Sequence, residues 1–110
     1  MSIGTDIMKL NNALYEELAS AQRLSQNTIN ILLGVELMNA KAKHPVFAKS
    51  PHHAMCILTE EVGEIAQELN NPTIDVKAYR TEILQVMVVC QRMLEQDLSE
   101  TGISPESNSQ

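Results

Sequence analysis

The chain has 110 residues and a formal net charge of −6 at pH 7. This length suits one domain with a single core and leaves no room for a separate substrate domain. The acidic balance argues against binding to a nucleic-acid polymer, because a phosphate backbone calls for a basic protein face. Neither a basic-then-apolar leader nor an apolar stretch of membrane-spanning length is present, so no secretion and no membrane partner are expected.

Residues 5–42 are expected to be helical, with Thr5 or Asp6 as the N-cap. The apolar residues with helical spacing in this region are Leu10, Leu14, Leu18, Ala21, Leu24, Ile31, Leu32, Val35 and Met38. No Pro or Gly interrupts residues 25–28. One long bent helix and two shorter helices are therefore both compatible with the sequence.

A polar connection from Lys43 to Ser50 precedes the next expected helix. Ser50 suits an N-cap and Pro51 the first helical position, and the helix is expected to reach about Leu69. Its apolar stripe is narrow and consists of Leu58, Val62, Ile65 and Leu69.

A last helix is expected after the turn formed by residues 70–73, with Asp75 as its cap and an end near Leu98. Apolar residues cover almost all its faces: Ile83, Leu84, Val86, Met87, Val88, Val89, Cys90, Met93 and Leu94. A helix that is apolar all round is normally buried all round, which in so small a chain predicts a homodimer or homotetramer. Residues 1–98 are thus expected to form one all-α domain, and residues 99–110 a disordered tail.

The two cysteines, Cys56 and Cys90, lie in apolar helical runs and lack the spacing of a metal or redox motif. We expect them to be reduced and buried. Reduced thiols favour a cytoplasmic location.

Acidic side chains recur at helical spacing on the last two expected helices. Glu61 and Glu64 are three positions apart and share a face, and Glu82 and Gln85 repeat this spacing on the next helix. Oxygen ligands on rigid helices suit Mg²⁺ or Mn²⁺, which keep several waters and bind phosphate oxygens. The pattern predicts metal-assisted attack on a phosphate ester or anhydride, although such glutamate runs are also typical of a solvated helix face.

Glu82 favours a role beyond a solvated face, because it begins an otherwise apolar strip of its helix. A carboxylate in that position must be paired or coordinated. Salt bridges to Lys77 or Arg80 would make it structural, whereas coordination of a metal together with Glu61 and Glu64 would make it functional. Spacing alone leaves both open.

The run ILTEEVGEIAQELN, preceded by AKHPVF and followed by YRTEILQVMVV, resembles the MazG-like all-α nucleoside triphosphate pyrophosphohydrolases. Their signature is Glu-Glu-x-x-Glu on one helix and Glu-x-x-Asp on the next. The resemblance covers roughly residues 36–95. It implies a four-helix-bundle-like, oligomeric fold and hydrolysis of a ribo- or deoxyribonucleoside triphosphate to the monophosphate and pyrophosphate.

The resemblance also implies roles for individual residues. Glu61, Glu64 and Glu82 correspond to the family's Mg²⁺ ligands, and Gln85 occupies the place of the fourth. Glu60 would be an accessory acid, and Glu60 or Glu61 the catalytic group that orients the attacking water or accepts its proton. From their proximity in the sequence, and not from the resemblance, Lys41, Lys43, Lys77 or Arg80 are expected to supply cationic contacts to the substrate phosphates.

Gln85 departs from the family pattern, which has Asp at this position. An amide oxygen can coordinate Mg²⁺, but it lowers the charge of the site and cannot act as a base. Three outcomes are open: an active enzyme with weaker metal affinity, an enzyme that uses fewer metals, or a helical oligomer that has lost catalysis and binds nucleotide or a protein. A plain oligomerisation module with surface or salt-bridged acids is a further alternative.

Overall fold

The computed structural model describes residues 12–20 and 22–99. The secondary-structure elements in these residues are all α-helices. They are residues 12–19, α2 (Gln26–Lys43), α3 (Pro51–Leu69) and α4 (Val76–Leu94). The prediction of an all-α fold is confirmed for this part of the chain. The predicted N-cap at Thr5 or Asp6 lies outside the described residues, as do residues 100–110 of the tail predicted for residues 99–110. Residue 99 is described, and the backbone N–H of Ser99 donates to the Ala48 carbonyl at 2.9 Å.

The N-terminal region contains two helices rather than one. The first ends at residue 19, and α2 begins after an N-cap at Ser25, whose side-chain oxygen accepts a hydrogen bond from the backbone N–H of Thr28 at 3.1 Å. This cap satisfies one of the free donors at the start of α2. A serine without an accompanying Pro or Gly is a weak break signal in the sequence, which is why both alternatives were open.

Both later helices begin where the sequence predicted. Ser50 accepts from the backbone N–H of His53 at 3.2 Å, and Pro51 is the first residue of α3. Asp75 accepts from the backbone N–H of Ala78 at 3.1 Å at the start of α4. These side chains replace hydrogen bonds that the first helical turn cannot make within itself.

The end of α4 differs from the prediction, because the helix stops at Leu94 rather than near Leu98. Gln96 has a φ of 53°, and its backbone N–H donates to the Met93 carbonyl at 3.1 Å. The N–H of Asp97 donates to the Arg92 carbonyl at 3.2 Å. These bonds form a Schellman motif. The motif was hard to predict because its left-handed residue is Gln rather than Gly.

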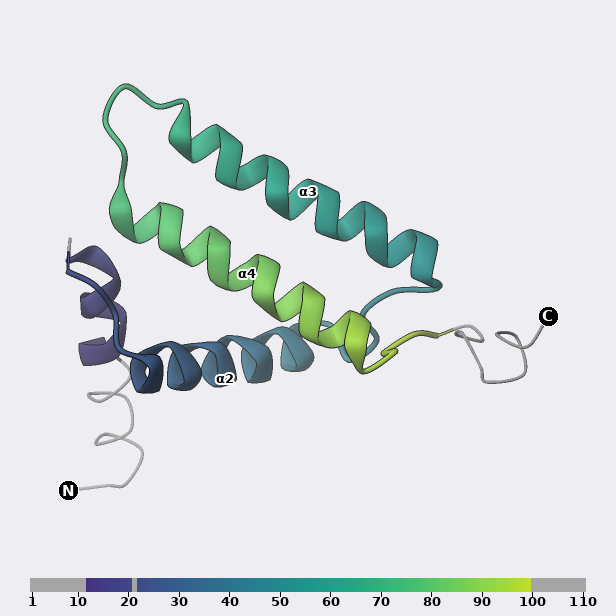
Figure 1. The fold of residues 1–110 in the computed structure, drawn as a ribbon. Coiled ribbons are helices and arrows are strands. Elements are labelled where there is room, and N and C mark those ends of the chain that lie inside the picture. Colours follow the sequence, from purple (N-terminus) through teal and green to yellow (C-terminus); the bar gives the residue numbers. More distant parts are fainter. Residues whose placement is uncertain (1–11, 21, 100–110) are drawn as a thin grey trace, which may run out of the picture.

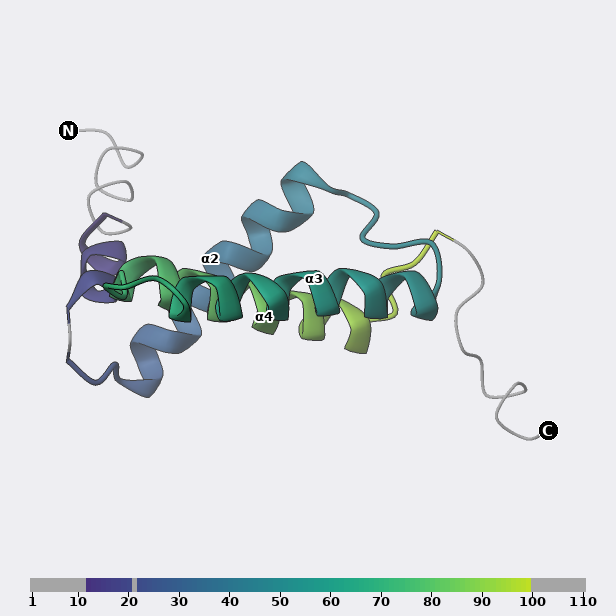
Figure 2. The ribbon, with the colours of Figure 1, turned by 90° about the horizontal axis from the view of Figure 1, so that it is seen from above.

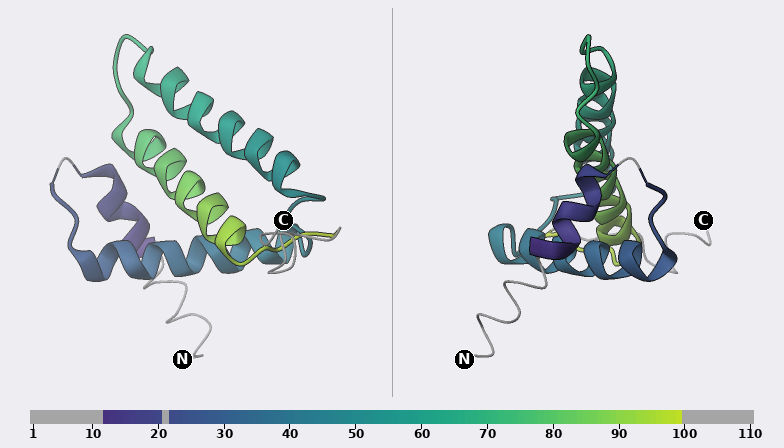
Figure 3. Two further views of the ribbon diagram at one scale, coloured as in Figure 1. Left: turned by 45° about the vertical axis from the view of Figure 1, so that its right-hand side comes forward. Right: turned by 90° about the vertical axis from the view of Figure 1, so that its left-hand side faces the viewer.

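The helices α3 and α4 form an antiparallel hairpin, and α2 crosses beneath it (Figures 1 and 2). Figure 3 shows the hairpin standing on α2, with residues 12–19 beside the first turns of α4. Leu18, Leu32 and Leu84 form a buried cluster that joins residues 12–19, α2 and α4. Beyond the C-terminal end of α4, Leu98 forms an isolated β-bridge with Ala48, which precedes α3.

This arrangement gives α4 the central position, because it packs against both α3 and α2. Leu84, Val88 and Val89 are buried, whereas Leu94 at its end is 86% exposed. The chain itself therefore covers part of this apolar helix, whereas Cys90 and Leu94 remain exposed. The predicted homodimer or homotetramer remains a prediction.

The cysteine prediction is correct in one respect and wrong in another. Cys56 and Cys90 are free thiols, but both are exposed rather than buried. Apolar neighbours in the sequence did not establish which helix face each cysteine occupies. Within residues 12–20 and 22–99, no helix has the length and apolar character needed to cross a membrane.

Candidate metal centre

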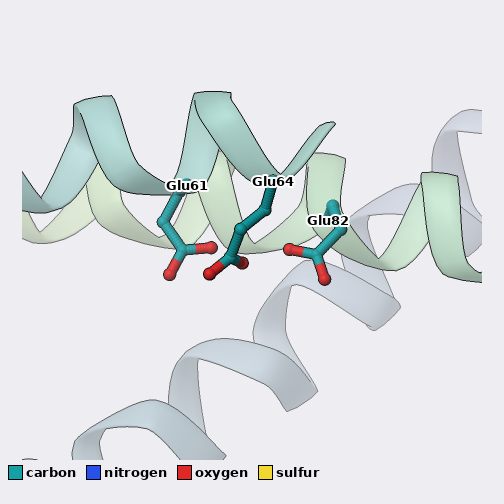
Figure 4. Close-up of side chains that lie close together, drawn as sticks. All are labelled: Glu61, Glu64 and Glu82. Atoms are coloured by element: carbon teal, nitrogen blue, oxygen red, sulfur yellow. The ribbon is translucent and has the colours of Figure 1, made fainter. Parts of the chain in front are cut away.

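Three predicted metal ligands lie together on one face of the hairpin of α3 and α4, with Glu64 exposed and Glu61 and Glu82 half-buried. Glu61 and Glu64 come from adjacent turns of α3 and Glu82 comes from α4, and their carboxylates gather on one side of the hairpin (Figure 4). One carboxylate oxygen from each residue lies within 4.8 Å of those of the other two. The antiparallel packing of α3 on α4 creates this cluster from positions far apart in the sequence.

Two oxygens of the cluster have no hydrogen-bond partner among the described residues. These are Oε2 of Glu61 and Oε2 of Glu82, and both atoms are buried. Buried polar atoms normally have a partner, because burial removes the water that would otherwise solvate them. Each of these two oxygens can therefore accept a proton or a cation.

The alternative of a structural salt bridge to Glu82 is not realised. The ion pairs between described residues are Lys41 with Glu95 and Arg92 with Asp97. Arg80 instead donates to the carbonyl oxygens of Ser20 at 2.9 Å and Gln22 at 2.7 Å. The guanidinium of Arg80 therefore holds the chain between residues 12–19 and α2.

The electrostatics of the cluster favour protonation when no cation is bound. Burial raises the pKa of Glu82 to about 7, and hydrogen bonding to Glu64 and the charges of Glu64, Glu61 and Glu68 add to the rise. Burial is also the largest cause of the raised pKa of Glu61, followed by the charge and hydrogen bonding of Glu64 and the charge of Glu60. Like charges held together in a desolvated place are stabilised either by protons or by a cation.

Gln85, the predicted fourth ligand, is hydrogen-bonded to Glu36, a residue for which the sequence predicted no role. Its Nε2 donates to Oε2 of Glu36 on α2 at 2.7 Å. The hydroxyl of Tyr15 donates to the other oxygen, Oε1, of Glu36. The sequence does contain a signal for Glu36, because it is an isolated carboxylate among the apolar residues of α2. The same kind of signal singled out Glu82 on α4.

A cavity of about 270 Å³ adjoins the cluster. It is lined by Ala40, His44, Phe47, Ile57, Glu61, Gln85, Val88, Val89 and Arg92. Gln85 and Glu61 therefore line one cavity, whereas Glu64 and Glu82 are not among its lining residues. The walls are otherwise largely apolar, and Phe47 supplies an aromatic ring.

The remaining predicted site residues lie at the periphery. Glu60 is exposed and is not part of the carboxylate cluster. Lys43 is exposed in the last turn of α2, and Lys77 is exposed in the first turn of α4. Their predicted contacts with substrate stay predictions.

Comparison of the chain with models of protein families, with curated proteins and with solved structures finds no match.

Proposed function

We propose that this chain is a metal-dependent nucleoside triphosphate pyrophosphohydrolase with a MazG-type fold, and that Glu61, Glu64 and Glu82 hold Mg²⁺ or Mn²⁺. The observation that carries the proposal is the pair of buried, unpartnered carboxylate oxygens on two facing helices. Their convergence with Glu64 follows the spacing that the family signature implies. Carboxylate oxygens are the donors that hard divalent cations prefer.

When bound, the cation would neutralise charge on the phosphate oxygens and lower the pKa of a water. The residues of the chain have separate tasks around it. Glu61, with Glu60 one position before it, would orient the attacking water and accept its proton. The positions of Lys43 and Lys77 at helix ends leave their amino groups exposed for phosphate contacts.

The cavity beside Glu61 is the proposed place of the nucleoside. Its largely apolar walls suit a flat heteroaromatic base, and Phe47 can stack on such a base. The other two aromatic residues of the chain, Tyr15 and Tyr79, are not among the residues that line this cavity.

Self-association is the second part of the proposal, and it is supported by α3 rather than α4. Met55, Val62 and Leu69 are seven positions apart on α3 and are 54%, 50% and 47% exposed. Residues at this spacing lie along one face of a helix. An apolar stripe of this kind suits contact with a second copy of the chain.

The deciding experiment measures pyrophosphate release from a panel of ribo- and deoxyribonucleoside triphosphates with Mg²⁺ or Mn²⁺. We expect Glu61→Ala to reduce the rate by about 100-fold or more, as happens when a group that stabilises the transition state is removed. Glu16→Ala, which removes an exposed carboxylate from residues 12–19, is the matched control and should keep the native rate.

Equal rates in Glu61→Ala and the native chain would contradict the proposal, provided that both proteins have the same folding and oligomeric state. Absence of release with all substrates, together with nucleotide binding that depends on metal, would instead support the alternative of a catalytically inactive binding module. The presence of Gln85 favours this alternative, because its amide adds no negative charge to the site.

A further inference from the structure

Gln85 stands where the family signature has Asp, and its side chain contacts Glu36 on α2. Glu36 receives two hydrogen bonds, one from the Tyr15 hydroxyl and one from Nε2 of Gln85. These three residues come from the helix of residues 12–19, from α2 and from α4. They form a continuous polar chain that ends at the cavity beside Glu61.

The chemistry of Glu36 decides which end of the Gln85 amide faces it. Its oxygens accept from the Tyr15 hydroxyl and from Nε2 of Gln85, so the NH₂ group of the amide faces Glu36. The amide oxygen of Gln85 then points away from Glu36. Without Glu36, the two ends of the amide would be nearly equivalent in size and either could face the cavity.

Tyr15 keeps Glu36 in the orientation that this requires. Burial raises the pKa of Tyr15, and hydrogen bonding and the charge of Glu36 raise it further. The hydroxyl therefore remains a donor at ordinary pH. It occupies Oε1 of Glu36, which leaves Oε2 for Gln85.

We infer that Glu36, anchored by Tyr15, is a positioning residue that turns the amide oxygen of Gln85 toward the site and makes it the neutral oxygen donor next to Glu61, Glu64 and Glu82. This inference rests on the proposed metal site. It explains how Gln is accommodated where the family signature has Asp: a carboxylate at position 85 would lie against the carboxylate of Glu36, and the two like charges would repel.

The test measures Mn²⁺ affinity from the electron paramagnetic resonance signal of free Mn²⁺, which needs no catalytic turnover. Glu36→Leu removes the acceptor, and we expect it to weaken Mn²⁺ binding by about 10-fold or more, the usual effect of losing a partner that orients a metal ligand. Glu36→Gln still offers an oxygen to Nε2 of Gln85, so its loss should be smaller. Glu16→Gln removes an exposed carboxylate and serves as the control for charge.

The decisive comparison exchanges the carboxylate and the amide between positions 36 and 85. Gln85→Glu alone should weaken Mn²⁺ binding because two carboxylates face each other, whereas the double variant Glu36→Gln/Gln85→Glu should restore at least native affinity. In the double variant the amide at position 36 donates to the carboxylate at position 85. This comparison keeps the inference testable even if Glu36→Leu does not fold, which circular dichroism would reveal.

The Mn²⁺ affinities separate failure of the proposed metal site from failure of the inference about Glu36. A native protein that does not bind Mn²⁺ would overturn the proposed metal site and this inference with it. Native binding that Glu36→Leu leaves unchanged would overturn the inference alone. Equal losses in Glu36→Leu and Glu36→Gln, without recovery in the double variant, would mean that Glu36 acts through its charge and does not orient Gln85.

Discussion

At the scale of single residues, Gln96 carries a local strain that a substitution can remove. Its φ of 53° lies in the left-handed region, where a side chain costs about 1 kcal/mol relative to glycine. Gln96→Gly should therefore raise the free energy of unfolding by about 0.5–1 kcal/mol. Chemical denaturation of the two proteins measures this difference.

Gln96→Ala is the matched control, because alanine keeps the Cβ that makes the left-handed conformation unfavourable. It should not stabilise the protein. If alanine and glycine raised the free energy of unfolding equally, the cause would be loss of the glutamine side chain, and the argument from backbone conformation would be wrong.

At the scale of the helices, Arg92 joins the end of α4 to the end of α2. Its side chain is 2% exposed, and it donates to Oδ2 of Asp97 and to the His44 carbonyl, each at 2.7 Å. The guanidinium also lies 5.3 Å from the centre of the Phe47 ring. Arg92→Leu would leave these acceptors unpaired and should lower the free energy of unfolding by about 3 kcal/mol.

The exposed ion pair between Lys41 and Glu95, 2.9 Å apart, also links α2 to the end of α4. It serves as the comparison with the buried Arg92. Lys41→Ala should lower the free energy of unfolding by less than about 1 kcal/mol, because water already solvates both charges. Thermal or chemical unfolding of both variants tests the contrast. A small effect of Arg92→Leu would show that the connection between these helix ends does not depend on the buried arginine.

At the scale of the whole molecule, the carboxylate cluster makes stability depend on pH. The pKa of Glu82 is about 7 in the folded protein and 4.5 as its ordinary value, so between these values the folded state holds a proton that the unfolded chain has released. Stability from this proton is complete below about pH 4.5 and is lost as pH rises through about 7. The raised pKa of Glu61 acts in the same direction.

We therefore expect the metal-free native protein to lose thermal stability, relative to Glu82→Gln, as the pH rises from about 5 to about 8. Added Mg²⁺ should raise the unfolding temperature of the native protein more at the higher pH, where cation and proton compete least. Thermal unfolding across this range is the measurement. Parallel profiles for the native protein and Glu82→Gln would contradict the raised pKa.

Much of the fold could be predicted because the signals that start and stop helices are local. Ser50 with Pro51, and Asp75 after the turn at 70–73, marked the starts of α3 and α4 correctly. The end of α4 was missed because Gln96 adopts a conformation that its residue type does not announce. Exposure of the cysteines was missed because it depends on which helix faces meet.

Local sequence was enough to place the starts of α3 and α4, through their capping residues, and to put Glu61 and Glu64 on one helix face, through the period of the α-helix. Only the tertiary structure decided that Glu82 joins them without a basic partner, and that Glu36 reaches Gln85 from α2. The reason is physical: partners on different helices are chosen by how apolar faces pack together, and that packing brings together residues that are far apart along the chain.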